Sequence, residues 1–412
     1  MTRNHSSRRL LAVAGGVFSL LLAHPGTGAA QSGGQGGYNG GFFIRDAAGN
    51  NELRIGGFYQ TRYIFNSRDE DGPGNNDLDV GGFQLRRGQI NFQGNIFNPR
   101  WTFRTRIDAS NGGAFSAAYL WFAYTTEDDE FTFRVGQLKP EFLQEEVISD
   151  YAQQSAERSS LNEYFTTDFS KGVQLVARPT DRLQVTGTVH GGSYSYRSDY
   201  TAAPTSVGFA GRASWVAVGE NPSRARSQFG DFQAWDGEQT AALVGLAADY
   251  ELGRDGFPDL LKWTADGSLE SEGVSLFGAI VGQHFSTSGP LSGGVPGAIN
   301  GVDQLGFIGQ AAYMVLPNKL DAFARFESID FDGAWYRLNQ GSVLNGSRNL
   351  ADDHLSLLTF GVNRYLVKNN ARFTLDFVHA FDPVPVSDAG NALLQSDSGD
   401  QTTIRAQVQL RF

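Results

Sequence analysis

Strict alternation of apolar and polar side chains is the feature that most limits how this chain can fold. In residues 403–412 every second side chain is apolar, namely Ile404, Ala406, Val408, Leu410 and Phe412. The side chains between them are polar, namely Arg405, Gln407, Gln409 and Arg411. Successive side chains of a strand point to opposite faces, so this segment predicts a β-strand with one apolar and one polar face.

The same alternation recurs at 53–63, 87–96, 101–108 and 131–135. Turn-forming residues separate such runs at 98–99, 126–130, 179–181, 317–318 and 368–370. Long polar connections lie at 66–82, 138–170, 192–207, 287–303, 330–351 and 383–400. Short and long connections alternate, as they do between the two ends of a membrane barrel. The spacing predicts about 16 antiparallel strands, with 14 or 18 as alternatives because 217–239 is too long for the short turn expected there.

Alternation alone does not separate a soluble β-sandwich from a barrel whose apolar face meets lipid. The composition favours the barrel, since 40% hydrophobic residues coexist with a mean hydropathy of −0.30 and only 19% charged residues. A phenylalanine closing the last strand also resembles the signal that bacterial barrel-assembly machinery reads. We therefore predict an all-β transmembrane antiparallel barrel in the bacterial outer membrane, with lipid and that machinery as partners.

Residues 1–30 have the pattern of a signal peptide. A basic start with Arg3, Arg8 and Arg9 precedes an apolar stretch over 10–22, and the small residues 28–30 suit a signal peptidase. The apolar stretch is shorter than the roughly 20 residues that a spanning helix needs. We assign 1–30 to the signal, the glycine-rich residues 31–50 to a flexible lead-in, and 51–412 to the barrel.

Charge placement suggests what the polar face does. The formal charge is −11, and removing the three arginines of the signal leaves −14 (−11 minus 3). Acidic residues gather in predicted connections such as 68–71, whereas arginines recur on the polar strand faces, among them Arg62, Arg87, Arg104, Arg106, Arg134 and Arg405. Lining charges set the ionic preference of a pore, so we expect anions to be favoured. The alternative is that acids on the same faces, such as Asp108 and Asp376, neutralise the arginines.

The connection 138–170 follows the fifth predicted strand and is unusually long. Folded inward it would constrict the pore, and Lys139, Arg158 and Lys171 would contact solutes there. The alternative is an external surface loop.

These segments resemble the phosphate-selective porin O/P family. The resemblance rests on Arg86-Arg87, on 101–108, on the run 135–142 (Val-Gly-Gln-Leu-Lys-Pro-Glu-Phe), on Glu157-Arg158 and on 171–173, with weaker matches from 263 onward. It implies homotrimeric anion channels of 16 strands, in which arginines and lysines guide phosphate through a constriction. Arg86, Arg87, Lys139 and Arg158 fall on its motifs. The chain departs from the pattern in having only five lysines and no lysine cluster.

Other functions have weaker support. The chain has no cysteine and six scattered histidines, so we expect no metal and no cofactor. We expect no enzyme; His190 or His379 beside an acid and a serine would mark one. We predict passive diffusion of small anionic solutes, with phosphate or polyphosphate as candidates, and no nucleic-acid partner. A non-selective general porin and a non-conducting receptor or surface protein are the alternatives.

Overall fold

The computed structural model describes residues 34–412 except 70–77, 110–114, 194, 196–198, 200, 202–204, 255–257, 287–300, 333–353, 386 and 397–398. The predicted signal peptide therefore lies outside the described residues, as do parts of several long connections. No helix within the described ranges is long and apolar enough to cross a membrane.

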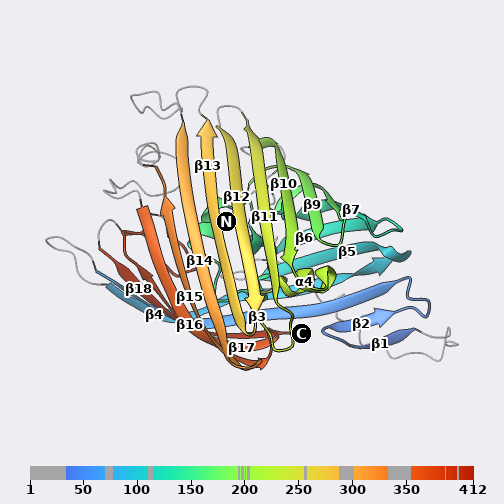
Figure 1. Ribbon diagram of the computed structural model, residues 1–412, viewed down its shortest axis with the longest axis horizontal. Coiled ribbons are helices and arrows are strands. Elements are labelled where there is room, and N and C mark those ends of the chain that lie inside the picture. The colour runs from blue at the N-terminus through green and yellow to red at the C-terminus, as the bar shows by residue number, and fades with distance from the viewer. Residues whose placement is uncertain are drawn as a thin grey trace, which may run out of the picture.

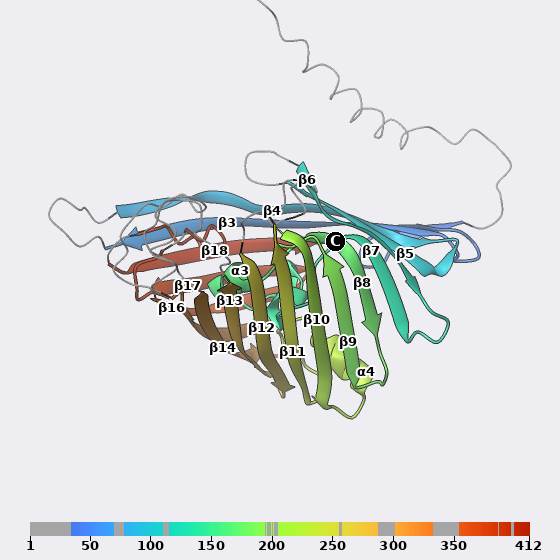
Figure 2. The same cartoon turned by 90° about the horizontal axis from the view of Figure 1, so that it is seen from above.

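Sixteen of the described strands close into one antiparallel barrel (Figures 1 and 2). The first half comprises β3 (Glu52–Arg68), β4 (Leu78–Ile96), β5 (Asn98–Ala109), β6 (Phe115–Thr125), β7 (Phe131–Leu138), β8 (Ser170–Ala177), β9 (Leu183–His190) and β10 (Thr205–Val218). The second half comprises β11 (Ala241–Gly253), β12 (Asp259–Ser271), β13 (Val274–Ser286), β14 (Val302–Leu316), β15 (Leu320–Asp330), β16 (His354–Val367), β17 (Ala371–Ala380) and β18 (Gln401–Arg411).

Each strand pairs with its neighbour in sequence, and β18 returns to pair with β3. The predicted barrel and its strand number are confirmed, and the alternatives of 14 and 18 are wrong. The stretch that made the count ambiguous contains the short helix α4 (Pro222–Gln228) and adds no strand.

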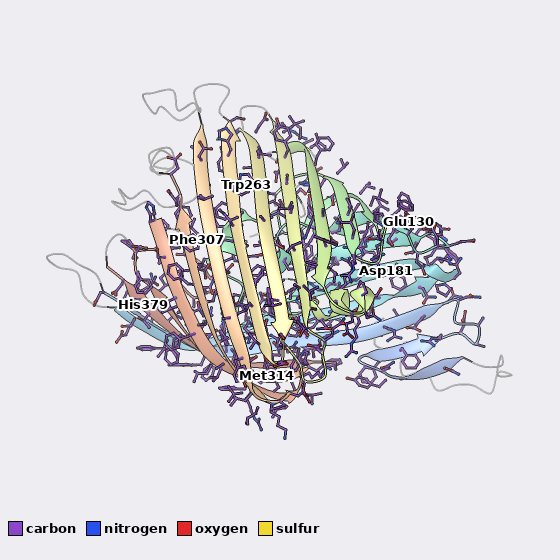
Figure 3. All side chains as sticks on the ribbon, viewed as in Figure 1. Glu130, Asp181, Trp263, Phe307, Met314 and His379 are labelled. Carbon is purple, nitrogen blue, oxygen red and sulfur yellow. The ribbon has the colours of Figure 1, made fainter. Side chains whose placement is uncertain are left out.

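The predicted alternation sets which side chains face outward. Trp263 and Phe307 lie on the outer wall in Figure 3, whereas polar neighbours such as Lys262 and Gln304 are buried on the inner side. The turn residues Glu130 and Asp181 mark the end with the short connections, which is periplasmic in bacterial barrels.

Residues 35–45 form a hairpin instead of the flexible lead-in expected there. Its strands are β1 (Gln35–Tyr38) and β2 (Phe42–Arg45), and β2 pairs with residues 52–55 of β3. The partner of β3 on that side, β18, ends its pairing at Phe58. The first residues of β3 therefore have a free backbone edge, and β2 satisfies its hydrogen bonds.

Residues 139–169 carry α2 (Gln144–Val147), the 3₁₀ turn Asp150–Ala152 and α3 (Ser160–Phe165). The backbone N–H of Gln144 donates to Asp266 of β12 at 3.1 Å, and that of Ala156 donates to Asp376 of β17 at 2.9 Å. Gln409 of β18 donates to the Tyr151 carbonyl at 2.9 Å. These partners belong to the inner faces of widely separated strands, so the segment lies within the ring of strands (Figure 2).

The inner wall of β13–β17 differs from the polar face that alternation predicted. Apolar side chains on this face, including Phe277, Val281 and Leu357, pack with Leu161 and Phe165 of α3 in one buried cluster. Strands covered on both sides are apolar on both faces. The 139–169 segment shields this wall from water, which explains why the alternation fails here.

Candidate functional site

A β-bulge places two consecutive arginines on the inner face of β4. Gln60 of β3 pairs with Arg87, but Thr61 pairs with Leu85, so Arg86 is the extra residue. Strict alternation would send one of the two side chains outward, whereas a bulge re-aims side chains locally. Both arginines therefore reach the same carboxylate, that of Glu157.

Glu157, on the 139–169 segment, is the centre of the first ion-pair group. Its Oε2 lies 2.5 Å from Nε of Arg86 and 3.6 Å from Nη1 of Arg62. Arg87 approaches both carboxylate oxygens and donates from Nη1 to Oε2 at 3.0 Å. Three predicted site arginines from two strands thus share one fully buried counter-charge.

Asp150 is the centre of the second group. Its Oδ2 lies 3.2 Å from Nε of Arg87 and 3.9 Å from Nη1 of Arg106, and its Oδ1 contacts Arg158. Arg106 also pairs with Asp108 at 2.8 Å. Arg158 donates to the Ile148 carbonyl at 2.6 Å, so it holds the segment's own backbone in shape.

Lys139 and Arg405 are also paired. Lys139 contacts Glu146, and its Nζ lies 2.8 Å from Asp168. The pair with Asp168 links the two ends of the 139–169 segment. Arg405 forms a two-pronged pair with Asp376, with both N–O distances 2.8 Å. Planar guanidinium and carboxylate groups match in this geometry. Most of the predicted site arginines are therefore paired with neighbouring acids, as the alternative expected.

Arg104 and Arg411 differ, because no carboxylate among the described residues forms an ion pair with either. Arg104 stacks 4.2 Å from the ring centre of Tyr119, and Arg411 stacks 3.9 Å from that of Tyr151. Their hydrogen bonds are long, 3.4 Å to Asn91 and 3.5 Å to Asn370. Arg411 is close enough to Arg104 for their charges to interact. The alternation put Arg411 on the polar face, but the predicted site residues did not include Arg411 or the two rings.

Arg134 of β7 completes the inner basic wall. Its Nη1 donates to Gln174 at 2.8 Å and lies 3.9 Å from Glu141. Its guanidinium stands 5.6 Å from the ring centre of Trp121. The carboxylate of Glu141 thus lies near the longest distance at which Arg134 could form an ion pair.

Lys171 does not join the inner group. Its side chain is exposed on β8, on the same face as Val173 and Leu175. The alternation of strand residues sends it outward, so its predicted place in the pore is wrong.

The backbone path of the run 135–142 depends on Gly136. Its φ is +132°, and a Cβ there would stand 2.2 Å from the Leu120 carbonyl oxygen. Glycine alone tolerates both the conformation and the close approach. The end of β7 can therefore turn inward and deliver Lys139 to the lumen.

Exposure separates two sides of the inner wall. The Arg86 and Arg134 side chains, on β4 and β7, are 24% and 28% exposed. Arg212, Arg325 and Arg405, on β10, β15 and β18, are at most 1% exposed. Water therefore reaches the inner face at Arg86 and Arg134, whereas the inner face is covered at Arg212, Arg325 and Arg405.

The histidines show no hydrolytic arrangement within the described ranges. His190 lies 3.0 Å from Asp249 through Nε2 and accepts from the Gly192 N–H through Nδ1. His379 bonds Thr402 at 2.9 Å. The described residues contain no group of three metal-ligating side chains.

Residues 59–231 match the sequence pattern of the family described as phosphate-selective porin O and P. No curated protein matches the sequence significantly. The matched range runs from β3 to α4 and includes the bulge, the 139–169 segment and every inner arginine discussed above except Arg325, Arg405 and Arg411.

Solved porins share the fold. An anion-selective porin from Comamonas acidovorans is similar over 87% of this chain and 99% of its own, with a TM-score of 0.57 and 11% identity. The outer-membrane channel DcaP of Acinetobacter baumannii covers 89% and 99%, with a TM-score of 0.54 and 11% identity. A trimer form of OmpT from Vibrio cholerae covers 87% and 98%, with a TM-score of 0.53 and 11% identity.

Together, the family pattern over residues 59–231 and the closed barrel of 16 strands identify the chain as a bacterial outer-membrane porin.

Proposed function

We propose that this porin passes small anionic solutes along the β4–β7 side of its lumen. The observation that carries the proposal is the imbalance of charge on that side. Asp108 is paired with Arg106, and Glu141 lies beside Arg134. Arg104 and Arg411 have no carboxylate partner among the described residues, so they leave a surplus of positive charge.

A surplus of fixed charge in a narrow, low-dielectric passage concentrates counter-ions. The guanidinium groups present several donors in a plane, which suits carboxylate and phosphate oxygens. Phosphate and polyphosphate are therefore candidate solutes. The scarcity of lysine argues for a weaker, more general anion preference than a dedicated phosphate site would give.

We further propose that the 139–169 segment forms the constriction. Its apolar side packs on β13–β17, and its charged side, with Glu157 and Asp150, faces the arginines of β3–β5. A solute on the open side would pass between this charged edge and Arg104. Glu157 and Asp150 then act chiefly as counter-charges that set how much positive potential the passage retains.

The assembly and its partners are part of the same proposal. The trimer form recorded for OmpT supports a homotrimer here. Lipid would contact the apolar outer wall, and the barrel-assembly machinery would read the strand that closes with Phe412.

Ion selectivity in a planar bilayer tests the proposal. Under a salt gradient, the parent protein is expected to give an anion-directed reversal potential, with conductance reduced by added phosphate. In Arg104→Ala/Arg411→Ala the anion-to-cation permeability ratio should fall by roughly fivefold per charge, because each charge contributes about 1 kcal/mol at a few ångströms in water.

Arg364→Ala is the matched control, because this arginine is exposed and donates to the Lys319 carbonyl rather than to the inner wall. It should leave selectivity unchanged. A cation-directed potential in the parent would instead assign the protein as a general porin governed by its acidic residues.

A further inference from the structure

The connection 219–240 lies at the end with the short turns, yet it enters the lumen. Its helix α4 lies next to β10 (Figure 1). Ala225 and Phe229 pack there against the inner-face residues Val216 and Leu243. Phe232 then joins the buried cluster inside the barrel, 5.0 Å from the ring of Phe277. A simple turn between β10 and β11 requires none of these contacts.

This connection meets the 139–169 segment, which enters from the opposite end of the barrel. The Phe232 N–H donates to the Ala152 carbonyl at 3.3 Å, and Gln144 donates to the Phe229 carbonyl at 3.1 Å. Gln233 donates to the Gln153 carbonyl at 3.2 Å. Hydrogen bonds thus join the two connections directly, and 219–240 supports the constricting segment from the periplasmic side.

The far end of the connection is fastened across the wall. Trp235 lies 4.8 Å from the ring of Tyr365 on β16, and the Asp236 N–H donates to Asn318 at 3.1 Å. Asn369, in the turn between β16 and β17, donates to Gln233 at 2.7 Å. The connection therefore spans the periplasmic part of the lumen from β10 to β17.

Three carboxylates come together where it is fastened, those of Asp231, Glu238 and Glu270. None forms an ion pair among the described residues. Asp231 accepts from the Trp235 indole at 3.1 Å, Glu238 from the Trp235 N–H at 2.7 Å, and Glu270 from Gln228 at 3.5 Å.

The cations near these three carboxylates contact other groups. Lys368 stands 5.0 Å from the Trp235 ring centre, Arg372 donates to the Gln153 carbonyl at 2.7 Å, and Arg224 donates to the Gly237 carbonyl at 2.6 Å. Burying ionised carboxylates without a paired cation is costly, and the neutral form avoids that cost.

We propose that residues 219–240 are a proton-controlled brace, which holds the 139–169 segment in acid and withdraws toward the periplasm as Asp231, Glu238 and Glu270 ionise.

The direction of the pH effect follows from the two acids outside the strands. Burial, the largest cause, raises the pKa of Asp231 to about 6 and that of Glu238 to about 7. Both carboxyls therefore bind a proton more tightly in the packed brace than in the released one. The brace is strongest below about pH 4 and weakens as the pH rises through 6 and 7. A difference of about two pKa units shifts the packed-to-released equilibrium by roughly 100-fold.

Thiol labelling measures the release directly, since the chain has no cysteine of its own. Ala234→Cys reports the packed state because Ala234 is buried, and Ser223→Cys is the exposed reference on the same connection. The ratio of their labelling rates removes the pH dependence of thiol reactivity. We expect the ratio to rise at least about tenfold from pH 5 to pH 8. A ratio that is independent of pH would overturn the proposal.

Single-channel conductance measures the consequence. The parent should conduct more at pH 8 than at pH 5. The variant Asp231→Asn/Glu238→Gln should keep the low conductance at both pH values. Glu127→Gln/Asp129→Asn removes two exposed carboxylates from another short turn and should behave as the parent. If this control abolished the pH response as fully as the brace variant, the response would belong to general surface charge. The labelling involves no solute, so its outcome is separate from that of the anion proposal.

Discussion

Glu157 shows how much one residue decides in this lumen. It is the shared counter-charge of Arg62, Arg86 and Arg87, and it lies on a connection rather than on a strand. Because Arg62 and Glu157 are fully buried while Arg86 is 24% exposed, the carboxylate both stabilises buried charge and lowers the positive potential at the arginine that water reaches. Stability and selectivity therefore depend on the same side chain.

Glu157→Gln is expected to lower the free energy of unfolding by on the order of 3–5 kcal/mol, because Arg62 and Arg86 lose this counter-charge and Arg87 keeps only Asp150. The folded fraction should become more anion-selective. Urea titration in detergent, followed by heat-modifiable mobility on gels, measures the first effect, and reversal potential measures the second. Glu127→Gln, which removes an exposed carboxylate, should change neither. Unaltered stability would mean that water or ions already screen the arginines.

Gly136→Ala tests the backbone near the end of β7, just before the 139–169 segment begins. The added Cβ would meet the Leu120 carbonyl at 2.2 Å and would occupy φ = +132°. We expect destabilisation of about 1–3 kcal/mol in the same urea titration. Gly187→Ala, where a Cβ meets open space, is the matched control and should be tolerated. Equal effects of the two substitutions would contradict the argument.

At the scale of elements, α3 and the inner faces of β13–β17 form a core inside the barrel. Leu161 and Phe165 are fully buried there and pack against the strand backbone at Gly306, where a Cβ would come within 3 Å of both side chains. The 139–169 segment is therefore held by packing as well as by hydrogen bonds.

Leu161→Ala/Phe165→Ala should loosen this element. Each truncation removes 2–5 kcal/mol of packing as an order of magnitude, so the segment should fluctuate, and single-channel recordings should show higher and noisier conductance. The outward pair Leu246→Ala/Phe307→Ala removes similar side chains from the lipid face and should leave the conductance unchanged.

Deleting residues 142–165 removes most of the 139–169 segment. The conductance should therefore rise above that of the point variants. The protein should also become less stable, because Phe277 and Leu357 would face water. No rise in conductance would place the segment outside the conducting path.

At the scale of the whole molecule, closure of the barrel depends on the pairing of β18 with β3. The Phe412 N–H donates to the Gly57 carbonyl at 3.0 Å, and the Gly57 N–H donates back at 2.9 Å. The Phe412 ring stacks on Tyr59 with centroids 6.2 Å apart, and a Cβ on Gly57 would stand 2.5 Å from that ring. One aromatic residue thus completes the seam at its periplasmic end.

Phe412→Ala should slow insertion into proteoliposomes that contain the barrel-assembly machinery, with a smaller effect in their absence. The difference isolates recognition of the terminal residue from loss of the seam contacts. Phe373→Ala, an outward aromatic on β17, should not discriminate between the two conditions. Equal slowing with and without the machinery would attribute the effect to the seam alone.

The sequence by itself determined the barrel, because strand alternation and turn residues are local properties that each segment carries independently. The inner arginines of the strands, apart from Arg86, followed from the same periodicity, because only the bulge in β4 turns Arg86 inward. The sequence also carries a signal for the covered inner wall. Residues 276–281 are apolar on both faces, which indicates a strand covered on its inner side.

Only the tertiary structure decided which charges remain free. The pairing of Glu157 with Arg86 and Arg87 requires a bulge in one strand and a connection that begins about 50 residues later, and neither has a periodic signature. The same holds for the brace 219–240, whose acids Asp231 and Glu238 are half-buried because the connection packs back into the lumen. Burial and ion pairing depend on contacts between distant segments, and these contacts exist only once the barrel has closed.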